Sequence, residues 1–376
     1  MAAREGAADA GQALMQCPTP PQRSRRGSVV TLESLEDFDE VIDARSPAEY
    51  AEDHIPGAVN LPVLNDAERA QVGTLYKQVS PFTAKKVGAA LVSRNIAHHL
   101  ETHFAERPKD YRPLVYCWRG GNRSGAMVTV LRAIGWEAAQ LEGGYKAYRR
   151  HVVAALEQLP QQLRFVVVCG KTGVGKSRFL RALAGLGAQV LDLEDLAAHM
   201  GSVLGADPQR PQPPQKHFET RVWQALRRFD PRRPVFVESE SKKIGNLHTP
   251  ETLLKRMRAS ECLTLETPMA VRIALLKADY QHFLKDPDAL ARQLDCLVPL
   301  LGHERINRWK DLATAGEWDT LVGELLVAHY DPAYTRSLGR NYAHAAEGPV
   351  LQLASPAEAD LLALARQALD LFEGAL

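Results

Sequence analysis

The sequence predicts an α/β protein built from two units and a helical C-terminal portion. Short apolar runs occur at residues 41–44 and 114–117 in the first half of the chain, and at 165–168 and 235–237 in the second. Helix-like stretches lie between them, and short buried strands that alternate with helices are typical of a parallel sheet. Beyond about Pro268 the apolar spacing is helical. A chain of 376 residues has room for two domains or three, at about 100–200 residues each.

The composition is that of an ordinary soluble globular protein. Hydrophobic residues make up 45% and charged residues 24%, and 46 Lys and Arg against 45 Asp and Glu leave a formal net charge of +1. These proportions exclude a chain disordered throughout, a collagen and a disulfide scaffold, and any contact with nucleic acid must come from a local basic patch. The five cysteines, at positions 17, 117, 169, 262 and 296, include no Cys-x-x-Cys pair. Such an odd, widely spaced set favours a reducing compartment, so we expect a cytoplasmic protein.

The pattern divides the chain into four segments. Residues 1–28 carry no apolar run long enough for a signal peptide or a spanning helix, and we expect a flexible N-terminal tail and no contact with a membrane. Residues 29–150 are the first α/β unit, and 151–163 are a connecting helix and linker, with the helix stopping at Pro160. Residues 164–376 are the second unit with its helical part.

A strand-to-helix junction in the first unit carries a candidate catalytic cysteine. The strand 114–116 leads into Cys117 and a glycine-rich loop, and a helix-like stretch follows. Backbone N–H groups of such a loop converge on an anion, and the helix N-terminus lowers the pKa of the thiol. Gly120 and Gly121 supply backbone freedom, and Arg123 can clamp an oxyanion. The alternative is a structural cysteine beside a glycine turn. The loop residues assigned to this anion site are Trp118, Arg119, Gly120, Gly121, Asn122 and Arg123.

A second anion site is predicted at the start of the second unit. Residues 170–177 match G-x-x-x-x-G-K-[ST] in full, after an apolar strand and before a helix-like stretch. The glycines let backbone N–H groups wrap a diphosphate, Lys176 reaches its terminal charge, and Ser177 can ligate Mg²⁺. Glu238, at the end of the next apolar strand, could hold Mg²⁺ through water or serve as a structural ion-pair partner. The phosphate-binding residues are Gly170, Thr172, Gly173, Gly175, Lys176 and Ser177.

The first unit resembles the rhodanese domain in the stretches 43–45, 54–58 and 142–145 and in the cysteine loop. The resemblance implies that the loop cysteine carries transferred sulfur or selenium. Cys117 to Arg123 is a seven-residue loop, longer than that of ordinary sulfurtransferases, and its length matches that of rhodanese-like phosphatases. The pocket is therefore expected to admit a tetrahedral phospho-anion.

A rhodanese unit followed directly by a P-loop unit resembles the bacterial tRNA 2-selenouridine synthase family. The stretches that carry this resemblance are 54–62, 65–69, 72–77 and 116–121 in the first unit, and 192–202 and 238–245 in the second. The resemblance implies that selenium replaces sulfur at C2 of the wobble uridine, in the anticodon region of tRNA. Geranyl diphosphate first alkylates the 2-thiouridine sulfur, and selenium from selenophosphate then displaces the geranyl thiol.

Both small substrates are phospho-anions, and the chain offers two anion loops to hold them. We expect the P-loop to hold geranyl diphosphate and the longer loop to hold selenophosphate, with the Cys117 thiolate accepting selenium. Trp118 and Arg119 could stack on and steer a splayed-out base. No tightly bound cofactor is expected, and Mg²⁺ at Ser177 is the candidate metal ion. Asp43 and Arg45 resemble a rhodanese ion pair, and His54 heads a turn as either a packing or a proton-transfer residue. The supporting residues are Asp43, Arg45, His54 and Glu238.

Other functions fit the same motifs. The Cys-x₅-Arg spacing also suits a phosphatase with a phosphocysteine intermediate, or a sulfurtransferase. The P-loop also suits a kinase or ATPase that a rhodanese module regulates. In a third alternative the rhodanese unit is an inactive scaffold, against which the intact Cys117 and Arg123 argue.

Overall fold

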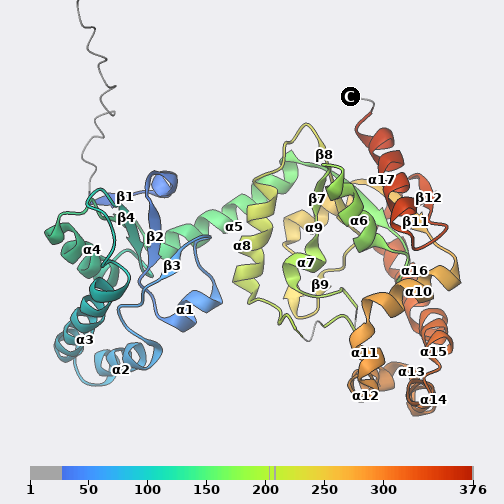
Figure 1. The fold of residues 1–376 in the computed structure, drawn as a ribbon, viewed down its shortest axis with the longest axis horizontal. Helices are drawn as coiled ribbons and strands as arrows, with labels where there is room; N and C mark the ends of the chain where they lie inside the picture. Colours follow the sequence, from blue (N-terminus) through green and yellow to red (C-terminus); the bar gives the residue numbers. More distant parts are fainter. Residues whose placement is uncertain (1–27, 203, 207–208, 375–376) are drawn as a thin grey trace, which may run out of the picture.

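Two five-stranded parallel sheets form the cores of two α/β units, and helix α5 runs between them (Figure 1). The computed structural model describes residues 28–202, 204–206 and 209–374, so the expected tail lies outside the described residues apart from Ser28. The predicted α/β class, with helices added at the C-terminal end, is confirmed. In this described part no helix combines the length and apolarity needed to span a membrane.

The first sheet has the strand order β1-β5-β4-β2-β3. The predicted strands 41–44 and 114–117 correspond to β2 and β4, which pair in parallel with Asp43 opposite Tyr116. The carboxyl ends of these two strands therefore meet at the same edge of the sheet. Its strands are β1 (Val29–Val30), β2 (Glu40–Asp43), β3 (Val59–Asn60), β4 (Pro113–Tyr116) and β5 (Ala139–Leu141). Its helices are η1 (Leu32–Asp37), α1 (Pro47–Glu52), α2 (Asp66–Gln78), α3 (Pro81–Thr102) and α4 (Asn122–Ile134).

The second sheet has the strand order β12-β11-β6-β8-β7. The predicted strands 165–168 and 235–237 correspond to β6 and β8, which lie side by side in parallel. The main strands are β6 (Arg164–Cys169), β7 (Gln189–Leu191), β8 (Pro234–Glu238), β11 (Glu261–Glu266) and β12 (Val350–Gln352), and a hairpin joins β9 (Lys243–Ile244) to β10 (Leu247–His248). The helices around this sheet are α6 (Lys176–Gly185), α7 (Leu193–Ala197), α8 (Gln215–Leu226), α9 (Glu251–Arg258) and α17 (Glu358–Phe372).

The segment after Pro268 is mostly helical, as predicted, but it returns one strand to the sheet. Strand β12 pairs in parallel with β11, and with three residues it is too short to stand out in the sequence pattern. The helices of this part are α10 (Met269–Asp279), α11 (Gln281–Lys285), α12 (Pro287–Leu294), η2 (Asp295–Leu297), α13 (Val298–Leu301), α14 (His303–Thr314), α15 (Trp318–Leu325), η3 (Leu326–Tyr330), α16 (Asp331–Asn341) and η4 (Ala343–Ala346).

The connecting helix is longer than predicted. Helix α5 spans Gly144–Gln162 and continues past Pro160, where the sequence predicts its end. Proline lacks a backbone N–H and its ring crowds the preceding turn, so it weakens a helix. Here it lies in the last turn of α5, two residues before the helix ends at Gln162. Val152, Leu156 and Pro160 are all buried on one face of α5, and this contact holds the helix together beyond the proline.

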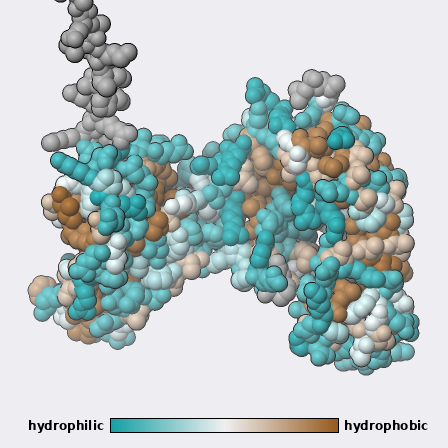
Figure 2. All heavy atoms as spheres, viewed as in Figure 1, coloured by the Kyte–Doolittle hydropathy of each residue, from teal (hydrophilic) through white to brown (hydrophobic). Residues whose placement is uncertain are grey.

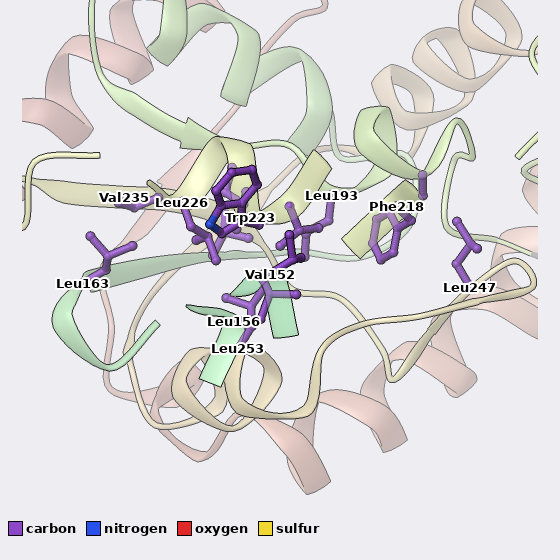
Figure 3. Packing of buried hydrophobic residues seen from close by; sticks show 14 of the residues in the cluster. Val152, Leu156, Leu163, Leu193, Phe218, Trp223, Leu226, Val235, Leu247 and Leu253 are labelled. Carbon is purple, nitrogen blue, oxygen red and sulfur yellow. The ribbon is translucent and has the colours of Figure 1, made fainter. Parts of the chain in front are cut away.

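The core around α5 extends into the second unit. Val152 and Leu156 on α5 lie near Phe218 and Trp223 on α8 and Leu253 on α9 (Figure 3). On the face drawn in Figure 2, hydrophilic side chains cover much of both units, with apolar patches between them. This apolar cluster packs α8 and α9 against the connecting helix.

We predict that Trp223→Ala destabilises the chain by about 3–5 kcal/mol, the usual cost of truncating a buried aromatic. The Trp223 ring packs edge-on against Tyr148 and His151 of α5, at centroid distances of 5.8 and 5.6 Å. Urea unfolding of the full chain, followed by circular dichroism, measures the change. Val153→Ala, at an exposed position of the same helix, should change the stability by less than about 0.5 kcal/mol. Equal midpoints for the two variants would contradict a stabilising role for the α5–α8 contact.

Candidate active site

Cys117 lies where the buried strand β4 ends and helix α4 is about to begin. All four residues of β4 are buried, and α4 starts at Asn122. The thiol is therefore close to the positive end of a thirteen-residue helix. Residues 117–123, called the Cys117 loop below, connect the two elements as the sequence predicts.

The surroundings of the Cys117 sulfur favour its thiolate form. Sγ accepts hydrogen bonds from the Ser124 hydroxyl at 3.1 Å and from the Gly121 N–H at 3.4 Å. Burial raises the pKa of the Cys117 thiol, but the hydrogen bonds from Ser124 and Gly121 and the charge of Arg123 outweigh it, and the net pKa is lowered. Gln140 on β5 donates to the Ser124 hydroxyl at 2.8 Å and so orients it toward the sulfur. The sequence pattern does not single out Gln140.

Two glycines let the Cys117 loop pack against the start of α5. Gly120 has φ +64°, and a Cβ atom there would lie 2.5 Å from the Leu141 carbonyl oxygen. Gly144 has φ +54°, and its Cβ would lie 2.2 Å from the Cys117 carbonyl oxygen. Both positions therefore require glycine. The loop is closed by the Tyr145 N–H, which donates to the Cys117 carbonyl at 2.8 Å.

The Arg123 guanidinium is already paired with a carboxylate, so it is not free to clamp an anion in the loop. Its guanidinium pairs with Glu49 of α1, at 2.6 and 3.3 Å to the two carboxylate oxygens, and Arg69 of α2 contacts the same carboxylate at 2.9 Å. These three side chains line a pocket of ≈ 560 Å³ that Arg45 and Lys216 also border. An anion in this pocket would compete with Glu49 for two arginines. The sequence could not indicate Glu49, because 74 residues separate it from Arg123.

The other residues of the Cys117 loop face outward. Trp118 and Arg119 are exposed, and the Trp118 ring lies 5.4 Å from that of Tyr145, where both border the pocket. Asn122 lines a different hollow, between α2, α3 and α4. Trp118 thus lies at the pocket mouth, where a base could stack on it, whereas Asn122 does not border the pocket.

Asp43, Arg45 and His54, the supporting residues of the first unit, make contacts that stabilise the fold. Asp43 and Arg45 form the expected ion pair, fully buried, with nitrogen–oxygen distances of 2.6 to 3.1 Å. The His54 ring stacks on Tyr50 at 3.9 Å, and burial lowers the pKa of His54. His54 does not border the pocket, so its contacts match the packing alternative.

The P-loop, residues 170–177, connects β6 to α6 in the second unit. Gly170, Gly173 and Gly175 have φ of +149°, +81° and +93°, which side chains disfavour. Lys176 lies at the first position of α6. The local geometry is that of a phosphate cradle at a helix N-terminus.

The P-loop is braced from the C-terminal helices. Arg272 of α10 is buried and donates to the Thr172 carbonyl at 3.0 and 2.8 Å. Its guanidinium also pairs with Asp331 of α16 at 2.6 Å. Nζ of Lys176 donates to the Gly170 carbonyl at 2.7 Å. Arg272 lies 100 residues from Thr172 in the sequence, so the motif alone does not reveal this brace.

Tyr334 of α16 completes the base of the P-loop. Its hydroxyl accepts from the Gly170 N–H, and its ring centroid lies 5.6 Å from Nζ of Lys176. Aromatic rings attract cations at such distances. Tyr334 therefore positions the lysine, a role that its place in a helical stretch does not indicate.

Four acids gather beside the P-loop: Asp192, Glu194, Glu238 and Glu240. The Ser177 hydroxyl donates to Glu194 at 3.0 Å, and the Glu194 N–H donates to Glu238 at 2.9 Å. Burial raises the pKa of Glu238 well above its usual range, and the charges of Asp192, Glu194 and Glu240 raise it further. Glu194 is thus the carboxylate in direct contact with Ser177, a residue that the sequence pattern does not single out, and Glu238 lies behind it, bonded to the Glu194 N–H. Glu238, the last residue of β8, is buried.

The described residues contain no group of three or more His, Cys, Asp or Glu side chains arranged to hold a metal ion. Four cysteines of the described part are free thiols, and three of them, including Cys117 and Cys169, are buried. Cys169 is adjacent to the P-loop but fully enclosed. Cys17 lies outside the described residues.

The fold and the two loops define a rhodanese-like domain joined to a P-loop domain. Residues 30–151 match the model of the rhodanese-like domain, and residues 163–294 match that of the tRNA 2-selenouridine synthase AAA domain. The chain belongs to the tRNA 2-selenouridine synthase family, as its relatives show.

Relatives from several bacteria carry the name tRNA 2-selenouridine synthase. The protein from Marinobacter nauticus is 34% identical over 79% of this chain and 88% of its own length. The protein from a Sulfurovum species is 36% identical over 80% of this chain and 89% of its own length. The protein from Nitrosomonas europaea is 34% identical over 69% of this chain and 68% of its own length. These matches extend across both domains.

We predict that Ser124→Ala raises the pKa of Cys117, because the sulfur loses its hydroxyl donor. At pH values below the pKa of Cys117, the rate of its alkylation by iodoacetamide should fall about tenfold, the usual effect of losing a hydrogen bond to a charged group. Mass spectrometry of the Cys117 peptide measures the rate across pH and separates it from the exposed Cys296. Thr129→Ala, on the outer face of the same helix, serves as control and should leave the profile unchanged. A Ser124→Ala profile that overlays that of the parent would contradict this account of the thiolate.

Proposed function

We propose that the chain converts 2-thiouridine to 2-selenouridine at the wobble position of tRNA, through an S-geranyl intermediate. Geranyl diphosphate and selenophosphate are the small substrates, and tRNA is the macromolecular one. The observation that carries this proposal is the presence of two different anion loops, one with a low-pKa cysteine and one with a P-loop lysine, in a single chain of the tRNA 2-selenouridine synthase family.

Geranyl transfer is assigned to the P-loop. The 2-thiouridine sulfur attacks C1 of geranyl diphosphate, the C–O bond to the diphosphate breaks, and the N3 proton of the base is lost. The glycine N–H groups and Lys176 stabilise the charge that develops on the leaving diphosphate. Arg272 keeps the loop in shape by holding the Thr172 carbonyl.

Mg²⁺ fits this site as a partner of the diphosphate. The Ser177 hydroxyl and the Glu194 carboxylate lie 3.0 Å apart, and Mg²⁺ takes one or two such oxygens together with phosphate oxygens. These two side chains would hold the ion, which would supply charge neutralisation to the leaving group.

Electron counting decides which atom of selenophosphate the Cys117 thiolate attacks. Selenium in selenophosphate is already fully reduced and phosphorus fully oxidised, so a selanyl sulfide on Cys117 could form only with release of phosphite. Attack on phosphorus instead forms S-phosphocysteine and releases HSe⁻, with no change of oxidation state. The phosphatase-like length of the Cys117 loop supports this second route, which takes the place of the selenium-carrier role implied by the resemblance.

The remaining steps then balance. HSe⁻ adds at C2 of the S-geranyl base, geranylthiolate leaves, and the proton of HSe⁻ moves to N3. Water hydrolyses S-phosphocysteine to phosphate and restores the thiol. Arg123 and Arg69 at the pocket stabilise the phosphoryl oxygens once the anion displaces Glu49.

The direct test incubates the purified chain with 2-thiouridine tRNA, geranyl diphosphate and selenophosphate, followed by mass spectrometry of the nucleosides. We expect S-geranyl-2-thiouridine when selenophosphate is omitted and 2-selenouridine when it is present. Finding neither base would refute the proposed function. Turnover of ATP or of a generic aryl phosphate in its place would favour the kinase or phosphatase alternative.

We predict that Lys176→Ala lowers the rate of geranylation by about 10²-fold or more, because the leaving diphosphate loses its principal cation. Single-turnover nucleoside analysis measures the rate. Lys255→Ala, an exposed lysine on α9, is the matched control and should retain the parental rate. Full geranylation by Lys176→Ala, together with a loss of selenation, would reverse the assignment of the two loops.

Cys117→Ser should geranylate tRNA at the parental rate but form no 2-selenouridine, because the serine hydroxyl is not ionised near neutral pH. Cys296→Ser, at an exposed thiol, is the control and should complete both steps. Phosphorus NMR of the parental reaction distinguishes the two routes, since attack on phosphorus produces phosphate and attack on selenium produces phosphite. Unimpaired selenation by Cys117→Ser would remove the cysteine from the reaction.

A further inference from the structure

A narrow apolar cavity opens beside the P-loop, within the C-terminal helices. Its walls come from η3 and from α10, α11, α12 and α15. Figure 1 shows these four α-helices together at one end of the second unit. The cavity also borders Thr172 of the P-loop. The cavity has a volume of ≈ 70 Å³, against ≈ 560 Å³ for the pocket beside the Cys117 loop. The cavity is too small for a bicyclic base, and a hydrocarbon chain enters it only where the flexible apolar side chains of its walls move aside.

The chemistry of the walls also favours a hydrocarbon. Leu276, Leu321, Val322 and Leu326 supply aliphatic surface, and the rings of Tyr280 and Trp318 lie among them. The Tyr280 hydroxyl is already paired with the Ser202 hydroxyl at 3.3 Å. A nucleoside would leave its polar edges without partners in such a cavity, at a cost that a hydrocarbon avoids.

The cavity and the phosphate cradle share one wall. Arg272 of α10 holds the Thr172 carbonyl, and Leu276, one turn further along the same helix, borders the cavity. Leu276 also packs so closely on Gly173 that a Cβ atom there would lie 2.8 Å from its Cδ1. A ligand whose diphosphate occupies the P-loop therefore has the cavity within reach of its ester carbon.

We propose that this cavity binds the isoprenoid chain of an allylic diphosphate, with the diphosphate group in the P-loop. The inference rests on the proposed function and adds the location of the hydrocarbon tail and the basis for choosing a prenyl diphosphate over a nucleotide. Binding of the tail follows apolar burial, so affinity rises with the number of carbons that the cavity encloses.

Calorimetry on the full chain tests this with geranyl diphosphate, dimethylallyl diphosphate, inorganic pyrophosphate and ATP. For the parent we expect geranyl diphosphate to bind at least about tenfold more tightly than dimethylallyl diphosphate, which has five fewer carbons to bury. Inorganic pyrophosphate should bind more weakly still, and ATP should gain nothing over pyrophosphate.

Val322→Phe fills the cavity from α15, and Leu284→Phe fills it from α11. Each variant should bind geranyl diphosphate at least about tenfold more weakly than the parent. The affinity for inorganic pyrophosphate should be unchanged, which also shows that the P-loop is intact. Val327→Phe, at an exposed position of η3, adds the same ring outside the cavity and should preserve the parental preference.

The outcomes separate the inference from the proposed function. An unchanged preference for geranyl diphosphate in both filling variants, while the parent still geranylates tRNA, would overturn the cavity assignment and leave the function intact. Equal affinity of the parent for geranyl diphosphate and pyrophosphate would also overturn it. A parent that forms neither modified base would instead reject the proposed function itself.

Discussion

The buried carboxylate of Asp53 joins the two α/β units. It is fully enclosed, and one of its oxygens accepts hydrogen bonds from Tyr145 on α5 at 2.8 Å and from Thr220 on α8 at 3.2 Å. A buried charge is tolerated only when its partners are held in place, so this contact fixes α8 against the first unit. Tyr145 also packs against Arg45 and Trp118. The shape of the pocket beside the Cys117 loop therefore depends on a contact made with the second unit.

Both anion loops are built by the same local rule. A buried parallel strand ends, glycines with positive φ turn the chain, and a helix N-terminus faces the turn. In each case a more distant acid holds an arginine beside the loop: Glu49 holds Arg123, and Asp331 holds Arg272. The two pairs differ in consequence. Arg123 borders an open pocket and can exchange its carboxylate for a substrate anion, whereas the buried Arg272 stays with the backbone as a brace.

The local parts of this design could be predicted from the sequence, and the long-range parts could not. Strands β4 and β6 and the loops that follow them are encoded within a few residues, so apolar runs and glycine spacing reveal them. The ion pair of Asp43 with Arg45 was expected from the resemblance to the rhodanese domain. Glu194 was missed because Glu238 ends a strand in the place where a metal-binding acid is usual, and only the packing of α7 shows which carboxylate meets Ser177. The α5 boundary was misplaced because buried contacts on the second unit override the proline signal.

The contrast between the two sites matches the two kinds of chemistry proposed for them. Phosphoryl transfer to Cys117 involves charged species throughout, and the pocket beside it is wide and lined by several ionic side chains. Prenyl transfer develops positive charge on an allylic carbon that water would trap, so it benefits from a narrow cavity that excludes solvent. The rings of Tyr280, Trp318 and Tyr330, which border the cavity, can stabilise such a cation. The C-terminal helices thus supply what the residues of the P-loop lack, an apolar surface beside the diphosphate.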